Sequence, residues 1–239
     1  MLNKQDHRRY APIGWTDFTW NPIKGCRYNC YYCYMRRLAG YSGDVRRYVF
    51  RPGELNAPFS TRRPAKIFVG SAGEMFGDWV PSEHIEAVLE VERYLERRHV
   101  FQHLTKNPKR YAEFQALYRP NLWLGTTVDG LSFTRGNIED LLEATAGVEG
   151  VIRWVSFEPL VQSVSWAELA GLDWIVIGGD STVGAEKPLR VWADSLIEKA
   201  REVGAAVWVK DNYQYPRRIK EFPKHVAAPE PAKQAGLFA

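Results

Sequence analysis

The chain has 239 residues, of which 45% are hydrophobic and 25% charged, and its net charge is +4. This composition is that of a globular protein, and no apolar run reaches the ~18 residues that a membrane helix needs. Residues 1–12 are polar, which argues against a secretory signal. We therefore expect a cytoplasmic protein whose thiols are reduced.

Seven short apolar runs, rich in β-branched and aromatic residues, predict the strands of one sheet. Runs without polar alternation are typical of parallel strands that are buried on both faces. The first run contains Pro22, which limits its pairing and makes it the weakest of the seven. The predicted strands are residues 18–23, 66–70, 100–104, 121–128, 152–157, 173–179 and 205–210.

Segments between these runs predict the helices. Ser82 and Asn107 are the expected N-caps of two of them, and Pro108 suits a first helical position. Two others end on Gly147 and Gly204, as helices often do. The predicted helices cover about 31–38, 81–98, 107–118, 137–147 and 193–204.

The alternation of strands and helices predicts an α/β fold with a parallel sheet, either open or curled into a barrel. We expect an N-terminal arm over residues 1–13 and a single α/β domain over 14–222. Residues 44–64 show no periodicity and are expected to form a loop over one face. Residues 223–239 are rich in Pro and Ala, which predicts a loosely ordered tail.

Polar residues follow almost every predicted strand, at the ends where parallel α/β proteins place their working groups. A single carboxylate at such a point could equally cap the next helix. Capping does not explain why the cysteines follow the first strand and so share the same rim. The rim residues are Gly73, Glu74, Lys106, Thr126, Thr127, Asp129, Glu158, Gly178, Gly179, Asp180, Lys210 and Asp211.

All three cysteines of the chain lie in the stretch "GCRYNCYYCYM", at Cys26, Cys30 and Cys33. Three unligated cysteines in one polar, aromatic loop match core packing poorly. A structural zinc site would need a fourth ligand, which one of the five histidines would have to supply. A [4Fe–4S] cluster held by three thiolates would instead keep one iron open for a substrate or cofactor.

The cysteine spacing CxxxCxxC, with the aromatic Tyr32 before the last cysteine, resembles the signature of the radical S-adenosylmethionine (SAM) superfamily. Further blocks resemble, in the same order, a phage-associated and largely uncharacterised radical-SAM-like family. The blocks are "GWTDFTWNPIKGC", "FVGSAGEMFGD", "FQHLTKNPKR", "LWLGTTVD", "VSFEPL" and "DWIVIGGDS". The resemblance implies a partial (βα)6-type barrel.

The resemblance also implies a cofactor set and local roles. Cys26, Cys30 and Cys33 would hold a [4Fe–4S] cluster whose open iron chelates SAM. An electron donor of the flavodoxin or ferredoxin type would reduce the cluster, and SAM would be cleaved to give a 5′-deoxyadenosyl radical. With no further cysteine, the chain has no second all-cysteine cluster.

The implied SAM contacts come from the rim. Gly73 and Glu74 would meet the SAM amino group, and Lys106 would pair with its carboxylate. Tyr32, Gly178 and Gly179 would lie near the adenine, where the glycines permit close backbone approach. Thr127, Asp129 and Glu158 would supply further polar contacts.

The substrate is less defined by the sequence. The six Arg pairs alone are more typical of a solvated surface. Together with a surplus of aromatic residues they motivate the hypothesis of a nucleic acid or nucleotide substrate, because Arg binds phosphates and aromatic rings stack on bases. The alternatives are an enzyme on a small metabolite, with the Arg pairs as plain surface, and a non-catalytic three-cysteine metal module. The candidates for completing hydrogen transfer, by position only, are Lys210, Asp211, Tyr213 and Tyr215.

Overall fold

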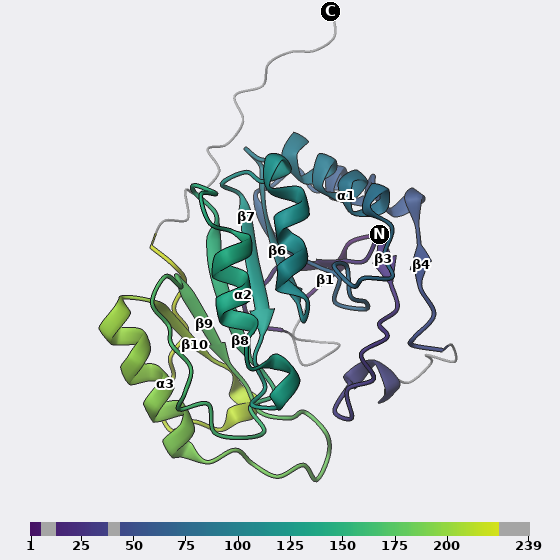
Figure 1. Ribbon diagram of the computed structural model, residues 1–239. Coiled ribbons are helices and arrows are strands. Elements are labelled where there is room, and N and C mark those ends of the chain that lie inside the picture. The colour runs from purple at the N-terminus through teal and green to yellow at the C-terminus, as the bar shows by residue number, and fades with distance from the viewer. Residues whose placement is uncertain (6–12, 38–43, 225–239) are drawn as a thin grey trace, which may run out of the picture.

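Each of the seven predicted strands contributes to one sheet in the computed structural model, which describes residues 1–5, 13–37 and 44–224 (Figure 1). From the second strand onward, all neighbours in this sheet are parallel and follow the order of the chain. In spatial order the strands are β1 (Asn3–Lys4), β2 (Phe18–Trp20), β5 (Ala65–Val69), β6 (His99–Thr105), β7 (Leu122–Thr127), β8 (Ile152–Phe157), β9 (Trp174–Ile177) and β10 (Ala206–Val209).

The first strands lie at one edge of this sheet. β2 ends at Trp20, just before Pro22, as the missing N–H of proline predicts. β1 pairs antiparallel with β2, so part of the expected N-terminal arm belongs to the sheet. Residues 6–12 of the arm and 225–239 of the expected tail lie outside the described residues.

Three α-helices connect the parallel strands, together with several short 3₁₀ helices. Figure 1 shows α2 lying across β7 and β8. The α-helices are α1 (Ser82–Tyr94), α2 (Asn137–Ala144) and α3 (Arg190–Val203). The 3₁₀ helices are η1 (Tyr34–Arg37), η2 (Pro52–Glu54), η3 (Ala57–Ser60), η4 (Pro108–Leu117), η5 (Ser132–Thr134) and η6 (Asp211–Tyr213). None of the helices in the described part of the chain is long and apolar enough to cross a membrane.

The predicted end of α3 is confirmed, because Gly204 adopts a left-handed conformation with φ of 76° directly after the helix. The prediction that Ser82 caps α1 was wrong. Ser82 is the first helical residue, and its hydroxyl accepts a hydrogen bond from the Arg110 side chain at 3.1 Å. The Ser82 hydroxyl, which the sequence predicts as the cap of α1, is therefore bonded to Arg110 of η4 instead.

Two other local predictions need correction. The helix expected from Tyr31 to about Leu38 is only the short η1, because Tyr31 and Tyr32 still belong to the turn, and Leu38 lies outside the described residues. Residues 44–64 are not a plain loop. They contain β4 (Val49–Phe50), which pairs antiparallel with β3 (Ile23–Lys24), and then η2 and η3.

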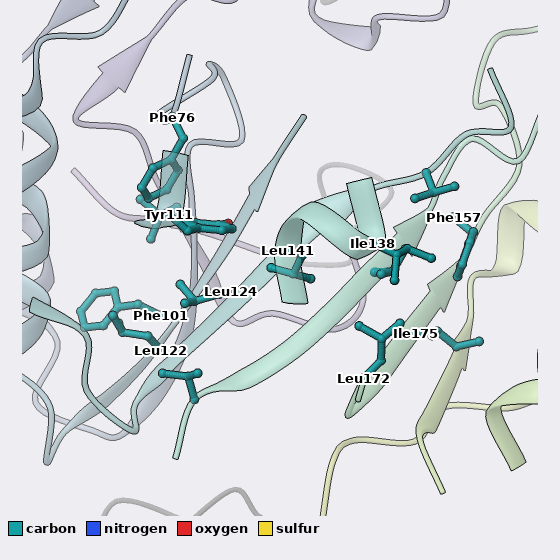
Figure 2. Packing of buried hydrophobic residues seen from close by; sticks show 14 of the residues in the cluster. Phe76, Phe101, Tyr111, Leu122, Leu124, Ile138, Leu141, Phe157, Leu172 and Ile175 are labelled. Carbon is teal, nitrogen blue, oxygen red and sulfur yellow. The ribbon is translucent and has the colours of Figure 1, made fainter. Parts of the chain in front are cut away.

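The helix-covered face of the sheet carries the larger core. Figure 2 shows Ile138 and Leu141 of α2 above side chains from several strands, including Leu124 and Ile175. All four of these side chains are at most 2% exposed. The burial of this face explains why the strands read as continuous apolar runs.

The opposite face is packed with aromatic rings around Trp15, which precedes β2. The ring of Trp15 lies 4.9 Å from Phe68 on β5 and 5.7 Å from Trp174 on β9. These two distances together are little more than half of the ~19 Å that four strand spacings span on a flat sheet. The sheet is therefore curved around this ring. The remaining buried members of this cluster are Val100, Trp123, Ile152, Trp154, Val176 and Trp208.

The packing predicts that Trp15→Ala lowers the free energy of unfolding by about 3–5 kcal/mol, because it empties the centre of the concave face. Urea denaturation followed by circular dichroism measures this loss. Tyr94→Ala is the control, because Tyr94 is 78% exposed, and it should change stability by less than about 0.5 kcal/mol. A loss below about 1 kcal/mol for Trp15→Ala would contradict the central role of this ring.

Candidate functional site

The concave face changes from aromatic to polar toward the carboxyl ends of the strands. Alternate residues of a strand point to the same face, so Trp154 is followed on this face by Ser156 and then by Glu158 just past β8. In the same way Trp123 is followed by Gly125 and Thr127 on β7. The aromatic cluster therefore lies next to the predicted rim residues, on the same face of the sheet.

The cysteine loop is joined to this rim by backbone contacts. Gly25 forms a parallel bridge with Gly73, its N–H donates to Ala72 at 3.2 Å, and its carbonyl accepts from the N–H of Glu74 at 3.0 Å. The chains approach so closely that a Cβ on Gly73 would lie 2.9 Å from the carbonyl oxygen of Ile23. Gly25 has φ of 93°, which also favours glycine.

Asn21 fixes the other side of this junction. Its side-chain oxygen accepts from the N–H of Ala72 at 2.7 Å and from the hydroxyl of Ser71 at 3.2 Å. The phenol of Tyr34 in η1 donates to the carbonyl of Ser71. The sequence analysis did not single out Asn21 or Ser71. Their position directly after β2 and β5 is the only signal that marks them.

The three cysteines are free and half-buried. The N–H of Cys26 donates to the carbonyl of Val45 at 2.9 Å, and Cys33 closes a turn onto the carbonyl of Cys30 at 3.2 Å. Burial, followed by the charge of Glu74, raises the pKa of the Cys26 thiol to about 12. A thiolate at this position therefore needs a cation, and a coordinated metal is the strongest cation that could supply it.

The described histidines are engaged away from the cysteines. His103 pairs with Glu92 of α1 at 2.8 Å on the helix-covered face, and His99 contacts the carbonyl of Pro58 at 3.2 Å. His84 stacks on Phe50 with ring centroids 3.9 Å apart. Within residues 1–5, 13–37 and 44–224, no three His, Cys, Asp or Glu side chains are grouped to hold a single metal ion. His7 and His225 lie outside the described residues.

Tyr32 connects the cysteine loop to the end of β7. Its phenol donates to Asp129, and both side chains are buried. Burial, followed by Asp129, raises the pKa of the Tyr32 phenol. The other oxygen of Asp129 accepts from Thr134 at 2.7 Å and from the N–H of Leu131 at 2.9 Å. The ammonium of Lys106 lies 5.7 Å from the centroid of the Tyr32 ring.

Glu74 is buried at the junction of β5 and β6. Its carboxylate accepts from the Thr105 hydroxyl at 2.6 Å, from the N–H of Lys106 at 3.0 Å and from the N–H of Phe76 at 3.1 Å. Burial raises the pKa of Glu74, while the bonds from Thr105 and Lys106 act in the opposite direction. The carboxylate thus ties the two strand ends together beneath the cysteine loop.

A second group of predicted residues gathers at the ends of β8, β9 and β10. Lys210 donates to the carboxylate of Glu158, whose side chain packs on Gly178. A Cβ on Gly178 would lie 2.8 Å from the Glu158 carboxyl carbon, which explains the glycine. Asn212, which the sequence analysis missed, donates to the carbonyl of Gly179 at 2.7 Å.

Tyr31 lies between the two groups. It is 66% exposed, and partial burial, then Asp180, then Asp129 raise the pKa of its phenol. Asp180 also accepts from the N–H of Thr182 at 2.8 Å. Thr127 is buried on the concave face, whereas Thr126 points to the helix side and donates to the carbonyl of Thr105 at 2.8 Å. The structure therefore brings most of the predicted rim residues to one edge, in two clusters.

The remaining positional candidates lie past the end of β10. Tyr213 is buried and donates to the carbonyl of Leu189 at 2.8 Å, and Tyr215 donates to Asp194 at 2.6 Å. Asp211 pairs with Lys220 at 2.7 Å. These contacts join Tyr213 and Tyr215 to α3 and the residue before it, whereas the Asp211 side chain is 96% exposed.

The fold and the site define a mostly parallel α/β protein with a three-cysteine loop docked on the carboxyl-end rim of its sheet. Residues 10–229 match the family described as protein of unknown function (DUF5131), and the chain belongs to this family. No curated protein and no solved structure gives a match to the chain.

The geometry predicts that Gly73→Ala displaces the cysteine loop, because the new methyl group would meet the backbone of Ile23 and Lys24 at about 2.9–3.0 Å. We expect a loss of about 1–3 kcal/mol in stability and faster alkylation of Cys26, measured peptide by peptide with mass spectrometry. Gly53→Ala is the matched control, since no atom lies within 4 Å of its Cβ position. Equal alkylation rates in the two variants would show that the junction does not position the loop.

Proposed function

We propose that this protein is a radical SAM enzyme in which Cys26, Cys30 and Cys33 hold a [4Fe–4S] cluster. The observation that carries the proposal is the docking of the CxxxCxxC loop, through Gly25 and Gly73, onto the rim where the polar strand ends meet. When bound and reduced, the cluster supplies the electron that cleaves SAM to methionine and a 5′-deoxyadenosyl radical for hydrogen abstraction from a substrate.

The donor set fits such a cluster. The loop offers three free thiols, which is one fewer than a fully ligated cluster uses. The raised pKa of the Cys26 thiol means that a bound metal is needed to keep it as thiolate. The described histidines pair elsewhere, which favours iron–sulfur ligation over the zinc alternative.

The sheet supports the finer assignment of a partial (βα)6-type barrel. Its parallel strands from β2 to β10 follow one another in chain order, and the concave face curves around Trp15. The sheet does not close, because β1 and β10 are its two edges.

The chain's own residues would bind and orient SAM. Lys106 has its ammonium above the Tyr32 ring and is the cation best placed to pair with the carboxylate of SAM. The buried Tyr32–Asp129 bond fixes the aromatic ring beside the last cysteine. Gly178 and Gly179 would lie near the adenine, and because the Glu158 side chain packs on Gly178, a base that approaches this backbone would displace the Glu158 carboxylate.

The direct test is anaerobic reconstitution with iron and sulfide, followed by reduction with dithionite in the presence of SAM. We expect about four irons per chain and formation of 5′-deoxyadenosine, measured by mass spectrometry. The control is the Cys26→Ala/Cys30→Ala/Cys33→Ala variant, which should bind no cluster and form no product. Zinc in place of iron, or a full cluster without product when SAM is saturating, would overturn the proposal.

The role of Lys106 gives a separate prediction. Lys106→Met should weaken SAM binding to the reconstituted protein by roughly 10-fold or more, because one charge-assisted contact to the SAM carboxylate is lost. Equilibrium dialysis with labelled SAM measures the dissociation constant. Lys109→Met is the matched control, because Lys109 is exposed and pairs with Asp140 at 3.5 Å. Equal SAM affinities for the two variants would show that Lys106 does not bind SAM.

A further inference from the structure

The positive charge of the chain is concentrated around the cysteine loop. Residues 24–51 contain seven Lys and Arg residues and one acidic residue, Asp44, so this stretch has a net charge of +6, whereas the whole chain has +4. The rest of the chain is therefore slightly acidic. A charge surplus confined to one segment next to the candidate site indicates an anionic ligand rather than general solubility.

Three of these arginines share one open pocket. Arg27, Arg46 and Arg47 line a cavity of about 510 Å³ together with Asp44 and Tyr48. In the described part of the chain, no carboxylate lies within 4.0 Å of any of the three guanidinium groups. Many other arginines do have such partners, as Arg201 has in Glu221 at 2.6 Å. Unpaired guanidinium groups around a pocket are suited to bidentate recognition of phosphate.

The pocket adjoins the first cysteine. The bond from the N–H of Cys26 to the carbonyl of Val45 brings residues 45–47 alongside Cys26, and Arg27 is its neighbour in sequence. The guanidinium of Arg27 lies 5.6 Å from the centroid of the Trp79 ring. This contact fixes the Arg27 side chain on an aromatic surface while leaving its N–H donors available.

The cysteine loop also presents an aromatic ring to solvent. Tyr31 lies 5.1 Å from Tyr32 between ring centroids and remains 66% exposed. Exposed aromatic rings beside a cationic groove are the means by which proteins bind single strands, since the rings stack on unpaired bases. A duplex would keep its bases away from Tyr31.

We propose that this surface binds the sugar–phosphate backbone of a single-stranded nucleic acid, with Arg27, Arg46 and Arg47 on phosphates and Tyr31 stacking on a base next to the rim. The proposal names the substrate class of the proposed radical SAM site, on which it depends for the reaction. Binding itself depends only on the arginines and Tyr31. Among the rim carboxylates, Glu158 is paired with Lys210, whereas the charges of Asp180 and Asp129 act on Tyr31. The phosphates are therefore assigned to the arginines, and only an uncharged base is assigned to Tyr31.

The test uses the full-length protein as purified and fluorescein-labelled single-stranded DNA and RNA of about 15 nucleotides. Fluorescence anisotropy gives the dissociation constants between about 50 mM and about 200 mM salt. We expect Arg46→Glu/Arg47→Glu to weaken binding at least ~10-fold at the lower salt concentration. The slope of log K against log salt should flatten by ~1.4, because each single-strand phosphate contact contributes ~0.7.

The matched control is Arg62→Glu/Arg63→Glu. These two arginines are also exposed, but they precede β5 and so lie at the amino-end edge of the sheet. This variant makes the same change in net charge and should alter affinity by less than ~2-fold, with an unchanged salt slope. Equal losses in the two variants would mean that only net charge matters, and would overturn the site.

The aromatic part of the proposal has its own pair of variants. Tyr31→Ala should weaken single-strand binding roughly 5-fold or more without changing the salt slope, because stacking is not ionic. Tyr94→Ala, which removes an exposed tyrosine from α1, should have no effect. Thermal melts of all four variants check that each is folded. Duplex binding as tight as single-strand binding would overturn the single-strand assignment.

The binding measurement and the SAM cleavage assay test the two proposals separately, so either proposal can be overturned while the other holds. Absence of affinity for DNA and RNA at about 50 mM salt would overturn the nucleic-acid surface even if 5′-deoxyadenosine forms. Binding that is lost in Arg46→Glu/Arg47→Glu but retained in Arg62→Glu/Arg63→Glu would establish the surface even if no SAM is cleaved. The preference between the DNA and RNA probes then distinguishes the two sources of the phosphate backbone.

Discussion

The candidate site depends on one close approach between two backbones. Where Gly25 crosses Gly73, no side chain fits between the chains, and the N–H of Glu74 bonds to the carbonyl of Gly25 at 3.0 Å. This contact brings Cys26 within the electrostatic influence of the Glu74 carboxylate, which in turn joins β5 to β6. A loop that would otherwise be independent is thereby held in register with the strand ends, which is what a cofactor spanning both would require.

The two faces of the sheet differ in the side chains that they carry. The helix-covered face is mostly apolar and contains the buried His103–Glu92 pair, while the concave face is aromatic at one end and polar at the other. A change at Glu158 or Thr127 is separated from the helix-covered core by the sheet itself.

The strands and the gathering of the rim could be predicted from the sequence because parallel strands are uniformly buried and end at a common edge. The exceptions are positions where distant contacts overrode local preference. The Ser82 hydroxyl accepts a hydrogen bond from Arg110 of η4 instead of capping its own helix. The Asn21 side chain accepts a hydrogen bond from the N–H of Ala72, after β5. No local pattern reports a partner 50 residues away, so the docking of the cysteine loop could be found only in the structure. The cysteine count itself was the one local signal that pointed to the site.

The two sides of the cysteine loop face groups of opposite charge. Toward the rim it meets carboxylates that are already bonded, such as Asp129 to Tyr32, and toward the β3–β4 hairpin it meets unpaired arginines around an open pocket. An anionic ligand is therefore attracted on the side of the loop that carries the arginines. Because Gly25 bonds to the rim and the adjacent Cys26 bonds to Val45, one loop would position a metal cofactor and orient a charged ligand toward it. This shared position gives a physical reason for placing every thiol of the chain in one short loop.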